Sequence, residues 1–210
     1  MSATTIAVVD YGAGNLVSIE QALTQVGARV VIARDADGIR GADALVVPGV
    51  GASRPAMERL SRADLIEPIR AWIAAERPFL GICLGLQLLF ETSDEDGAET
   101  LSVLAGRTAL LEEAPTLPHI GWNQVVRSAP QPLFAGIDEA ADFYFVHSYA
   151  GVPADPAVIA ATTEHGRPFV STVARGSLFG VQFHPERSGD DGLRLLSNFV
   201  AVTTAARAAA

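Results

Sequence analysis

In the first half of the chain the apolar residues come in short runs, and each run is followed by a polar or glycine-containing segment. Four such runs predict buried strands at residues 6–10, 29–33, 44–47 and 78–82. Apolar residues at helical spacing between them predict helices at 16–26 and at 54–75, the latter with a break or the start of a second helix at Pro68. Because strands that alternate with helices are typical of a parallel sheet covered on both faces, we expect an α/β fold.

The pattern changes after Glu91. Residues 92–99 are acidic and polar, which predicts a surface loop. Shorter strand-like runs then follow at 125–126, 142–146, 158–160, 169–173 and 178–183. We expect this half to contain a small antiparallel sheet and to end in a helix over 190–206. No linker divides the sequence, so we expect one domain over residues 1–210.

Composition narrows the class of protein. The chain has 210 residues, of which 49% are hydrophobic, and a net charge of −9, which disfavours a nucleic-acid partner. We expect neither a membrane span, since no apolar run approaches about 18 residues, nor a signal peptide, since Met1–Thr5 carries no positive charge. A single cysteine excludes an internal disulfide and favours a reducing compartment, so we expect a cytoplasmic protein.

That cysteine, Cys83, lies where the fourth strand gives way to a helical pattern, between Gly81 and Gly85. This arrangement predicts a nucleophile elbow, a tight turn in which glycines avoid steric overlap. A helix that starts at the sulfur would favour the reactive thiolate. The alternative is a buried structural cysteine, since free cysteine is among the most buried residue types.

A thiolate nucleophile needs a base, and the base needs a group that orients it. His184 follows a predicted strand, and Pro185 holds it near Glu186. A carboxylate two residues away could accept the Nδ1–H of the ring and leave Nε2 facing the sulfur. Taken singly, His184 could be a structural histidine and Glu186 a surface carboxylate; together with Cys83 they favour catalysis.

The remaining histidines offer no better base. His119 and His147 have no carboxylate beside them in sequence, and His165 lies in a predicted turn, where we expect it to be solvated. A metal site is disfavoured because there is one cysteine and no histidine pair has zinc-site spacing. We expect no metal and no cofactor.

An oxyanion intermediate needs backbone donors. The N–H of Leu84, directly after the nucleophile, is the expected first donor. The Pro48–Gly51 loop could bring the N–H of Val50 to the same place, although it could also be an ordinary turn between a strand and a helix.

These residues together resemble the class I (triad) glutamine amidotransferases. Gly81-Ile82-Cys83-Leu84-Gly85-Leu86-Gln87 is similar to the nucleophile motif of that family, and His184-Pro185-Glu186 is similar to its His-x-Glu pair. The branch that serves as glutaminase subunit of imidazole glycerol phosphate synthase is the most similar. The segments that carry this further likeness are 9–15, 48–52, 119–123, 143–149 and 181–189.

The resemblance implies a flavodoxin-like fold and a catalytic triad of Cys83, His184 and Glu186. It implies hydrolysis of glutamine through a cysteine thioester, with Gly51, Gln87, Ser148 and Tyr149 as substrate contacts. The ammonia would pass to a cyclase partner, a (β/α)₈ barrel bound as a heterodimer, in histidine biosynthesis. It also implies that the partner lies near Tyr11, Asn15, His119, Trp122 and Arg187, although Trp122 could equally be a core residue.

Two departures from the family pattern affect details. Arg187 stands where lysine is usual, which changes a point charge into a planar fork. Residues 100–106 replace a glycine-rich segment. Two other hypotheses remain open on sequence grounds. The chain could be a glutaminase subunit for pyridoxal phosphate, anthranilate or GMP synthesis, or it could be a non-catalytic scaffold with the same fold. The segments at 119–123 and 143–149 disfavour the first hypothesis, and the complete triad disfavours the second.

Overall fold

The computed structural model describes residues 3–209; Met1 and Ser2, part of the segment in which we expect no signal peptide, and Ala210 lie outside the described residues. Five parallel strands form the centre of the main sheet, in the order β2-β1-β3-β4-β14. Their bounds are β1 Thr5–Val9, β2 Arg29–Ala33, β3 Ala44–Gly49, β4 Phe79–Cys83 and β14 Leu178–Val181. The expected mostly parallel central sheet is confirmed.

The sheet continues beyond β14 in the order β13-β11-β7-β5-β6, through antiparallel pairs except that β5 runs parallel to β7. In addition β12 pairs with β13, and β9 pairs with β12. The bounds are β5 Thr92–Ser93, β6 Ala98–Glu99, β7 Gly106–Leu110, β9 Val126–Arg127, β11 Tyr149–Pro153, β12 Ile159–His165 and β13 Arg167–Arg175. A separate antiparallel pair, β8 (His119–Gln124) with β10 (Asp142–His147), is the small second sheet that we expected.

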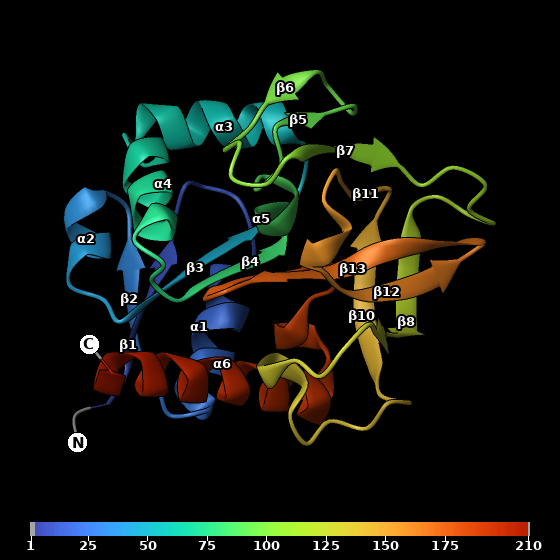
Figure 1. The fold of residues 1–210 in the computed structure, drawn as a ribbon. Coiled ribbons are helices and arrows are strands. Elements are labelled where there is room, and N and C mark those ends of the chain that lie inside the picture. The colour runs from blue at the N-terminus through green and yellow to red at the C-terminus, as the bar shows by residue number, and fades with distance from the viewer. Residues whose placement is uncertain (1–2, 210) are drawn as a thin grey trace.

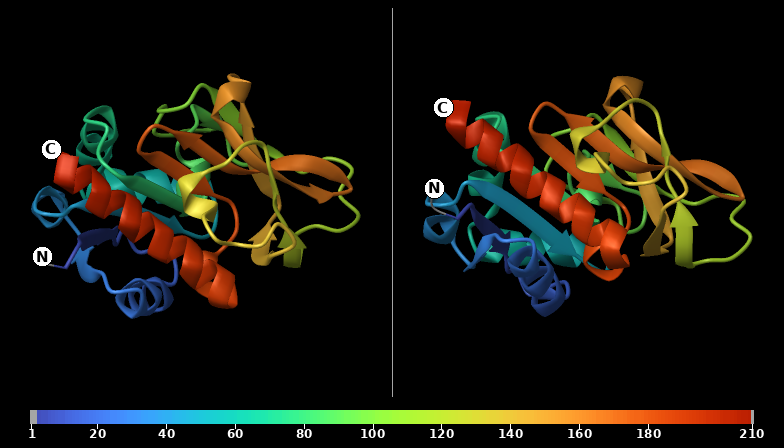
Figure 2. Two further views of the ribbon diagram at one scale, coloured as in Figure 1. Left: turned by 60° about the horizontal axis from the view of Figure 1, so that its bottom comes forward. Right: turned by 90° about the horizontal axis from the view of Figure 1, so that it is seen from below.

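Helices cover both faces of the parallel sheet (Figures 1 and 2). One face carries α1 (Leu16–Gln25) and the long C-terminal α6 (Gly189–Ala209), which lie side by side across the strands in the views of Figure 2. The other carries α2 (Ala36–Arg40), α3 (Ser53–Arg62) and α4 (Ile66–Ala74). Short 3₁₀ turns lie at η1 Pro132–Phe134, η2 Pro156–Val158 and η3 Pro185–Arg187.

The strands build two apolar cores because successive side chains point to opposite faces. In β1, Ile6 and Val8 pack toward α1 and α6, whereas Ala7 and Val9 pack toward α3 and α4. Both sets are fully buried. Such continuous burial explains why the runs are uniformly apolar instead of alternating, and it fixes the positions at which the strands end.

The residues predicted as helical over 54–75 form two helices. The break falls at residues 63–65, where Asp64 takes a positive φ of 53°, and Pro68 lies in the first turn of the second helix, α4, where a proline is tolerated; the expected start of a second helix near Pro68 is therefore confirmed. The expectation of a plain loop over 92–99 was wrong, because this acidic segment includes the short hairpin of β5 and β6. The helix expected directly after Cys83, α5, is short, Leu84–Gln87.

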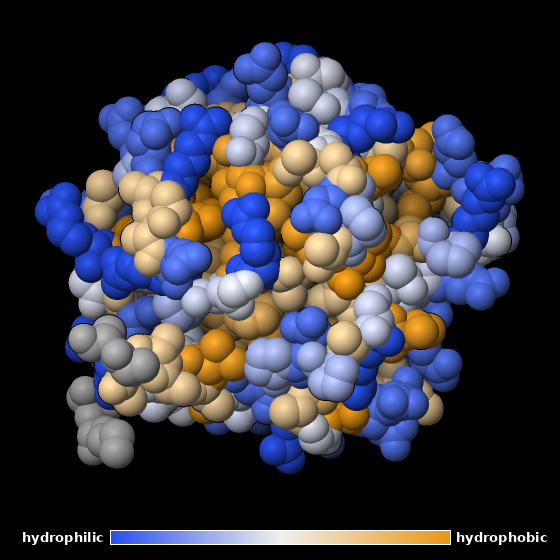
Figure 3. Space-filling model, in the orientation of Figure 1, coloured by the Kyte–Doolittle hydropathy of each residue, from blue (hydrophilic) through white to orange (hydrophobic). Residues whose placement is uncertain are grey.

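The surface in the orientation of Figure 1 is ringed by hydrophilic residues, while apolar residues gather in separate patches toward the middle (Figure 3). Within residues 3–209, no helix has the length and apolar character needed to cross a membrane.

Candidate active site

Cys83 is the last residue of β4, and α5 begins at the next residue. Its backbone has φ 53° and ψ −108°, a conformation that residues with a side chain rarely adopt. Strained conformations of this kind are held by their surroundings and gather at functional sites. The backbone therefore forms the turn that the sequence predicted, with the sulfur carried at its apex.

The two flanking glycines are required by close packing of backbone on backbone. A Cβ on Gly85 would overlap the carbonyl oxygen of Val47 in the neighbouring strand β3, and a Cβ on Gly81 would strike the carbonyl of Gly85 itself. Neither obstacle is a flexible side chain that could move aside. The Gly-x-Cys-x-Gly pattern thus lets the short helix α5 sit directly against the sheet.

His184 lies just past the end of β14, the strand next to β4. Its Nδ1 is 2.8 Å from Oε1 of Glu186, and both side chains are about 95% buried. The backbone of His184 is fixed as well: its N–H donates to the carbonyl of Tyr144 at 2.9 Å, and its own carbonyl accepts from the hydroxyl of Ser188 at 2.6 Å. The ring is therefore held both by its main chain and by Glu186.

The charges around His184 favour its protonated form. Burial by itself would lower the pKa of the ring, but Cys83 and Glu186 outweigh burial and raise the pKa above the usual 6.5. The other ring nitrogen, Nε2, is buried without a hydrogen-bond partner among the described residues. A protonated ring beside Cys83 can stabilise a thiolate and can later deliver a proton to a leaving group.

A cavity of about 310 Å³ opens above the sulfur. Its size is at the lower end of the range for small-molecule sites, about 300–1,000 Å³. Because Gly49 pairs with Cys83 across β3 and β4, Val50 and Leu84 are the residues that follow at the ends of two adjacent strands. The two predicted oxyanion donors are thus neighbours, and the loop around Val50 borders the cavity.

The cavity also collects the predicted substrate contacts. Its lining residues are Val50, Gly51, Ala52, Cys83, Gln87, Glu95, Pro118, Val146, His147, Ser148 and Tyr149. The carbonyl of Tyr149 already accepts from Nε2 of Gln87 at 2.8 Å and from Nδ1 of His147 at 2.8 Å. With both lone pairs of that carbonyl used, a ligand would have to meet other atoms of this segment.

Gln182 is a site residue that the sequence analysis missed. Its side chain is fully buried, and its Nε2 lies 3.6 Å from the sulfur of Cys83, within hydrogen-bond range for the large sulfur atom. It was counted only as part of the strand run at 178–183. The available signal was a glutamine between Val181 and Phe183, a polar side chain in an otherwise apolar strand.

Two of the predicted partner contacts lie inside the protein. Tyr11 is 5% exposed and His119 is 4% exposed, so neither side chain offers much surface for direct contact, and their expected place near the partner stays a prediction. Tyr11 lies two residues after the end of β1, and its hydroxyl packs against Gly49 behind the Val50 loop. Burial raises the pKa of Tyr11 above its usual 10.0. The ring of His119 stacks on the ring of His165, with 4.0 Å between the ring centroids. His165 is therefore only partly solvated, whereas we expected it to be a solvated loop residue.

The other three predicted contacts are on the surface. Trp122 is 57% exposed, which excludes the alternative of core packing. Asn15 caps α1 by accepting a hydrogen bond from the N–H of Ser18, and Arg187 is exposed with its guanidinium 4.2 Å from the ring centre of Tyr144. These residues remain available to a partner.

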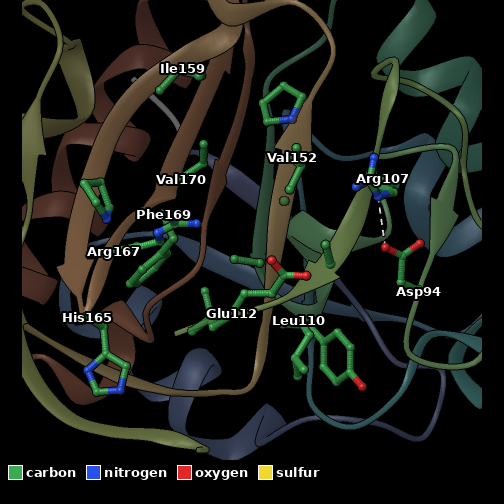
Figure 4. A pocket seen from close by; sticks show the side chains of 17 residues that line it. Asp94, Arg107, Leu110, Glu112, Val152, Ile159, His165, Arg167, Phe169 and Val170 are labelled. Atoms are coloured by element: carbon green, nitrogen blue, oxygen red, sulfur yellow. Dashed lines mark hydrogen bonds and ion pairs between the residues drawn. The ribbon is translucent and has the colours of Figure 1, made fainter. Parts of the chain in front are cut away.

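A larger groove, of about 670 Å³, lies along β7, β11 and β13 and does not include Cys83 (Figure 4). Apolar side chains such as Leu110, Val152 and Val170 line it, and the ion pair between Arg107 and Asp94 lies at one end. Among residues 3–209 no group of three or more histidine, cysteine or acidic side chains could hold a metal ion.

The comparisons with known proteins agree with this geometry. The family model described as "Glutamine amidotransferase class-I" matches residues 7–202. The chain belongs to the class I glutamine amidotransferases. A solved structure titled "Crystal structure of glutamine amidotransferase" has a TM-score of 0.72 at 19% identity and covers 94% of this chain and 98% of its own, a likeness that concerns the fold alone.

Closer relatives of this amidotransferase carry one name, "Imidazole glycerol phosphate synthase subunit HisH". The protein from Synechococcus sp. strain JA-2-3B'a(2-13) is 48% identical over 204 residues, which are 95% of this chain and 94% of the relative. The protein from Chloroflexus aurantiacus is 49% identical over 200 residues, 93% of this chain and 94% of the relative. This identity extends over nearly the full length of both aligned sequences, and it places this amidotransferase in the HisH branch of the family.

Proposed function

We propose that this amidotransferase is the glutaminase subunit of imidazole glycerol phosphate synthase. It hydrolyses glutamine to glutamate and ammonia, and a cyclase subunit uses the ammonia to form imidazole glycerol phosphate and AICAR in histidine biosynthesis. The likeness to HisH proteins supports the assignment to this synthase. The observation that carries the chemistry is the buried hydrogen bond of 2.8 Å between His184 and Glu186, next to a cysteine at the apex of a strained turn.

In the proposed reaction the thiolate of Cys83 attacks the side-chain amide carbon of glutamine. A C–S bond forms, and the negative charge on the amide oxygen is met by the backbone N–H groups of Leu84 and Val50. His184, held by Glu186, delivers its proton to the nitrogen, the C–N bond breaks, and ammonia leaves. Water activated by the same ring then hydrolyses the thioester and regenerates the thiol.

Gln87 is suited to hold the substrate in this cavity. Both N–H donors of its side chain are used inside the protein, toward Tyr149 and Gln182, and no donor in residues 3–209 reaches its side-chain oxygen, Oε1. That oxygen is an acceptor for the ammonium group of a substrate amino acid. Gly51 and Ser148 border the same cavity and supply further polar contacts, together with atoms of Tyr149 other than its carbonyl.

The partner surface that we propose lies beside the cavity mouth. Ile120 and Trp122 are 60% and 57% exposed on β8, and Val50 is 47% exposed on the oxyanion loop. Aromatic and aliphatic residues exposed together are typical of protein interfaces. A cyclase barrel docked here as a heterodimer, with Asn15 and Arg187 at its edge, would receive ammonia directly from Cys83. The chemistry needs a reduced thiol, in keeping with the cytoplasm.

The test is a glutaminase assay with the cyclase subunit of the same organism. Glutamate release from the purified chain is measured alone, with the cyclase, and with the cyclase plus its nucleotide ligand. We expect the rate to rise when the cyclase is added and to vanish in Cys83→Ala. Unchanged turnover in Cys83→Ala would overturn the assignment of the nucleophile, and absence of any stimulation would overturn the assignment to this synthase.

A further inference from the structure

Gln182 touches the sulfur of Cys83 and has no part in the triad. It is the first residue after β14, its side chain is fully buried, and its Nε2 is 3.6 Å from the sulfur. Buried polar side chains are costly unless they are hydrogen-bonded, so the orientation of this amide matters. Only its NH₂ end can donate to the sulfur; the carbonyl end would repel a thiolate.

The orientation of Gln182 follows from the backbone carbonyl of Tyr149, which can only accept. Gln87 must therefore turn its NH₂ group toward that carbonyl, at 2.8 Å. The second hydrogen of the same NH₂ group points to Oε1 of Gln182, at 3.2 Å. With its carbonyl oxygen engaged by Gln87, Gln182 has its NH₂ group on the side of the sulfur. The Tyr149 carbonyl thus fixes the orientation of the Gln87 amide, and the Gln87 amide fixes that of Gln182.

The same carbonyl orders two buried histidines. His147 contacts it through Nδ1 at 2.8 Å, so the proton of this ring lies on Nδ1. Burial lowers the pKa of His147 to about 3, so the ring is neutral and its Nε2 is an acceptor. His119 must then donate from Nδ1, 3.2 Å away, and accept at Nε2 from the amide of Asn123 at 3.3 Å. The tautomers of both rings are thereby assigned.

These contacts form one histidine–glutamine chain. On its histidine side each hydrogen bond is donated toward the Tyr149 carbonyl; on its glutamine side Gln87 donates both to that carbonyl and to Gln182, which in turn donates to the sulfur. Its members are Asn123, His119, His147, the carbonyl of Tyr149, Gln87 and Gln182. One end is the sulfur of Cys83. The other is β8, the strand that exposes Ile120 and Trp122. Hydrogen bonds in a largely buried network of this type restrict the orientations that its members can take.

We propose that Gln182 is a positioning residue for the nucleophile, whose amide N–H holds the Cys83 sulfur in an orientation fixed by the histidine–glutamine chain. For the glutaminase reaction this role rests on the function proposed above. A hydrogen bond donated to the sulfur favours the thiolate and restricts it to one place beside His184. Besides the oxyanion donors and the base, the site would then contain the Gln182 amide, which orients the Cys83 sulfur before the substrate binds.

The experiment measures alkylation of Cys83 by iodoacetamide as a function of pH, because this reaction follows the thiolate and needs neither glutamine nor a partner. Gln182→Met removes the donor and keeps the side-chain length. Gln182→Glu keeps an acceptor for Gln87 and turns an oxygen toward the sulfur. The matched control is Gln25→Met, at the exposed end of α1.

At pH 7 we expect alkylation of Gln182→Met to be slower by about 2- to 12-fold, the factor that corresponds to one typical hydrogen bond. The pH midpoint should move upward in Gln182→Met and further upward in Gln182→Glu, while Gln25→Met matches the wild type. A merely structural role would lower the folded fraction without moving the midpoint. Midpoints that coincide with the wild type in the folded variants would overturn the proposal.

A measurement on the unaltered protein covers the case in which the variants fail to fold. The side-chain NH₂ resonances of Gln182 should shift along the same pH curve as alkylation of Cys83, and resonances that stay constant across that curve would overturn the proposal. The assay also separates the two claims. If the midpoint moves as expected but the wild type with its cyclase releases no glutamate, the positioning role stands and the proposed function fails.

Discussion

Glu186 holds the ring of His184 through a hydrogen bond of 2.8 Å between two side chains that are each about 95% buried. Only Pro185 separates them in sequence, and the 3₁₀ turn Pro185–Arg187 brings the carboxylate back under the ring. The carboxylate thus fixes which nitrogen carries the outward proton, and it stabilises the charged ring. Both effects depend on the negative charge of Glu186 in a site from which water is excluded.

Glu186→Gln should therefore lower the rate much more than substrate binding. An amide has nearly the same shape as the carboxylate, but it removes the charge that stabilises the protonated ring. We expect kcat for glutamine hydrolysis in the presence of the cyclase to fall by about 10²- to 10⁴-fold, with KM changed little. The check is steady-state kinetics on a variant whose thermal midpoint is close to that of the wild type. An unchanged kcat would remove Glu186 from the triad.

The backbone of Cys83 stores strain that can be measured apart from activity. A residue with a side chain at φ 53° and ψ −108° is held there by its surroundings, whereas glycine accepts positive φ without penalty. Cys83→Ala keeps the strain and Cys83→Gly relieves it. We expect the free energy of unfolding, measured by chemical denaturation, to be about 1 kcal/mol higher for Cys83→Gly than for Cys83→Ala, although glycine normally destabilises a protein.

Both variants should lack glutaminase activity, so the comparison isolates the backbone. A lower stability of Cys83→Gly than of Cys83→Ala would mean that the turn is not strained. It would also remove one of the reasons for regarding it as an elbow built for chemistry.

Two buried histidines with lowered pKa values, His147 and His119, predict how stability depends on pH. The folded pKa of His147 is lowered to about 3, whereas an unfolded chain has the ordinary value of 6.5. Between these values the unfolded state binds the proton first, so this group stabilises the fold above pH 6.5 and loses that contribution as the pH falls toward 3. His119, lowered to about 4, acts in the same direction. The pKa of His184 is raised, so the stability that this group contributes is fully present below pH 6.5 and is lost only as the pH rises above that value.

We therefore expect the free energy of unfolding to decrease between pH 6.5 and 3 less steeply in His147→Gln than in the wild type. The difference in slope is limited to about 1.4 kcal/mol per pH unit, the value for one proton. Chemical denaturation at four or five pH values gives both slopes. Carboxylates contribute equally to the two proteins, so equal slopes would show that His147 is not kept neutral by burial.

How far the sequence predicted this structure depends on whether a position is governed by local pattern. The strand at 29–33 and the start of α1 at Leu16 were predicted correctly, because apolar periodicity and glycine breaks act within a few residues. The structure also brings together the residues predicted as a triad, since Cys83 and His184 stand at or just past the ends of adjacent strands and Glu186 contacts His184. By contrast β8 was missed, because one of its faces is exposed and Gly121 interrupts it.

The side chains whose surroundings the sequence did not predict are those decided by distant packing. Tyr11 follows a strand and is followed by glycines, which gave no sign that its hydroxyl packs against Gly49 under the loop around Val50. Gln182 contacts a sulfur that is 99 residues away in sequence. No local pattern encodes such contacts, since they depend on the order of strands β3, β4 and β14 in the sheet.

Trp122 gives the most direct test of the partner surface. Its ring is 57% exposed and is supported at its edge by Tyr144, with centroids 6.0 Å apart, so truncation removes surface without opening a cavity in the core. Trp122→Ala should leave the thermal midpoint nearly unchanged and weaken binding of the cyclase by about tenfold or more, as for an aromatic side chain central to an interface. The matched control is Val126→Ala on β9, 67% exposed and four residues away. Titration calorimetry with the cyclase gives both affinities. Equal affinity of the two variants would move the docking surface away from β8, and with it the route by which ammonia leaves Cys83.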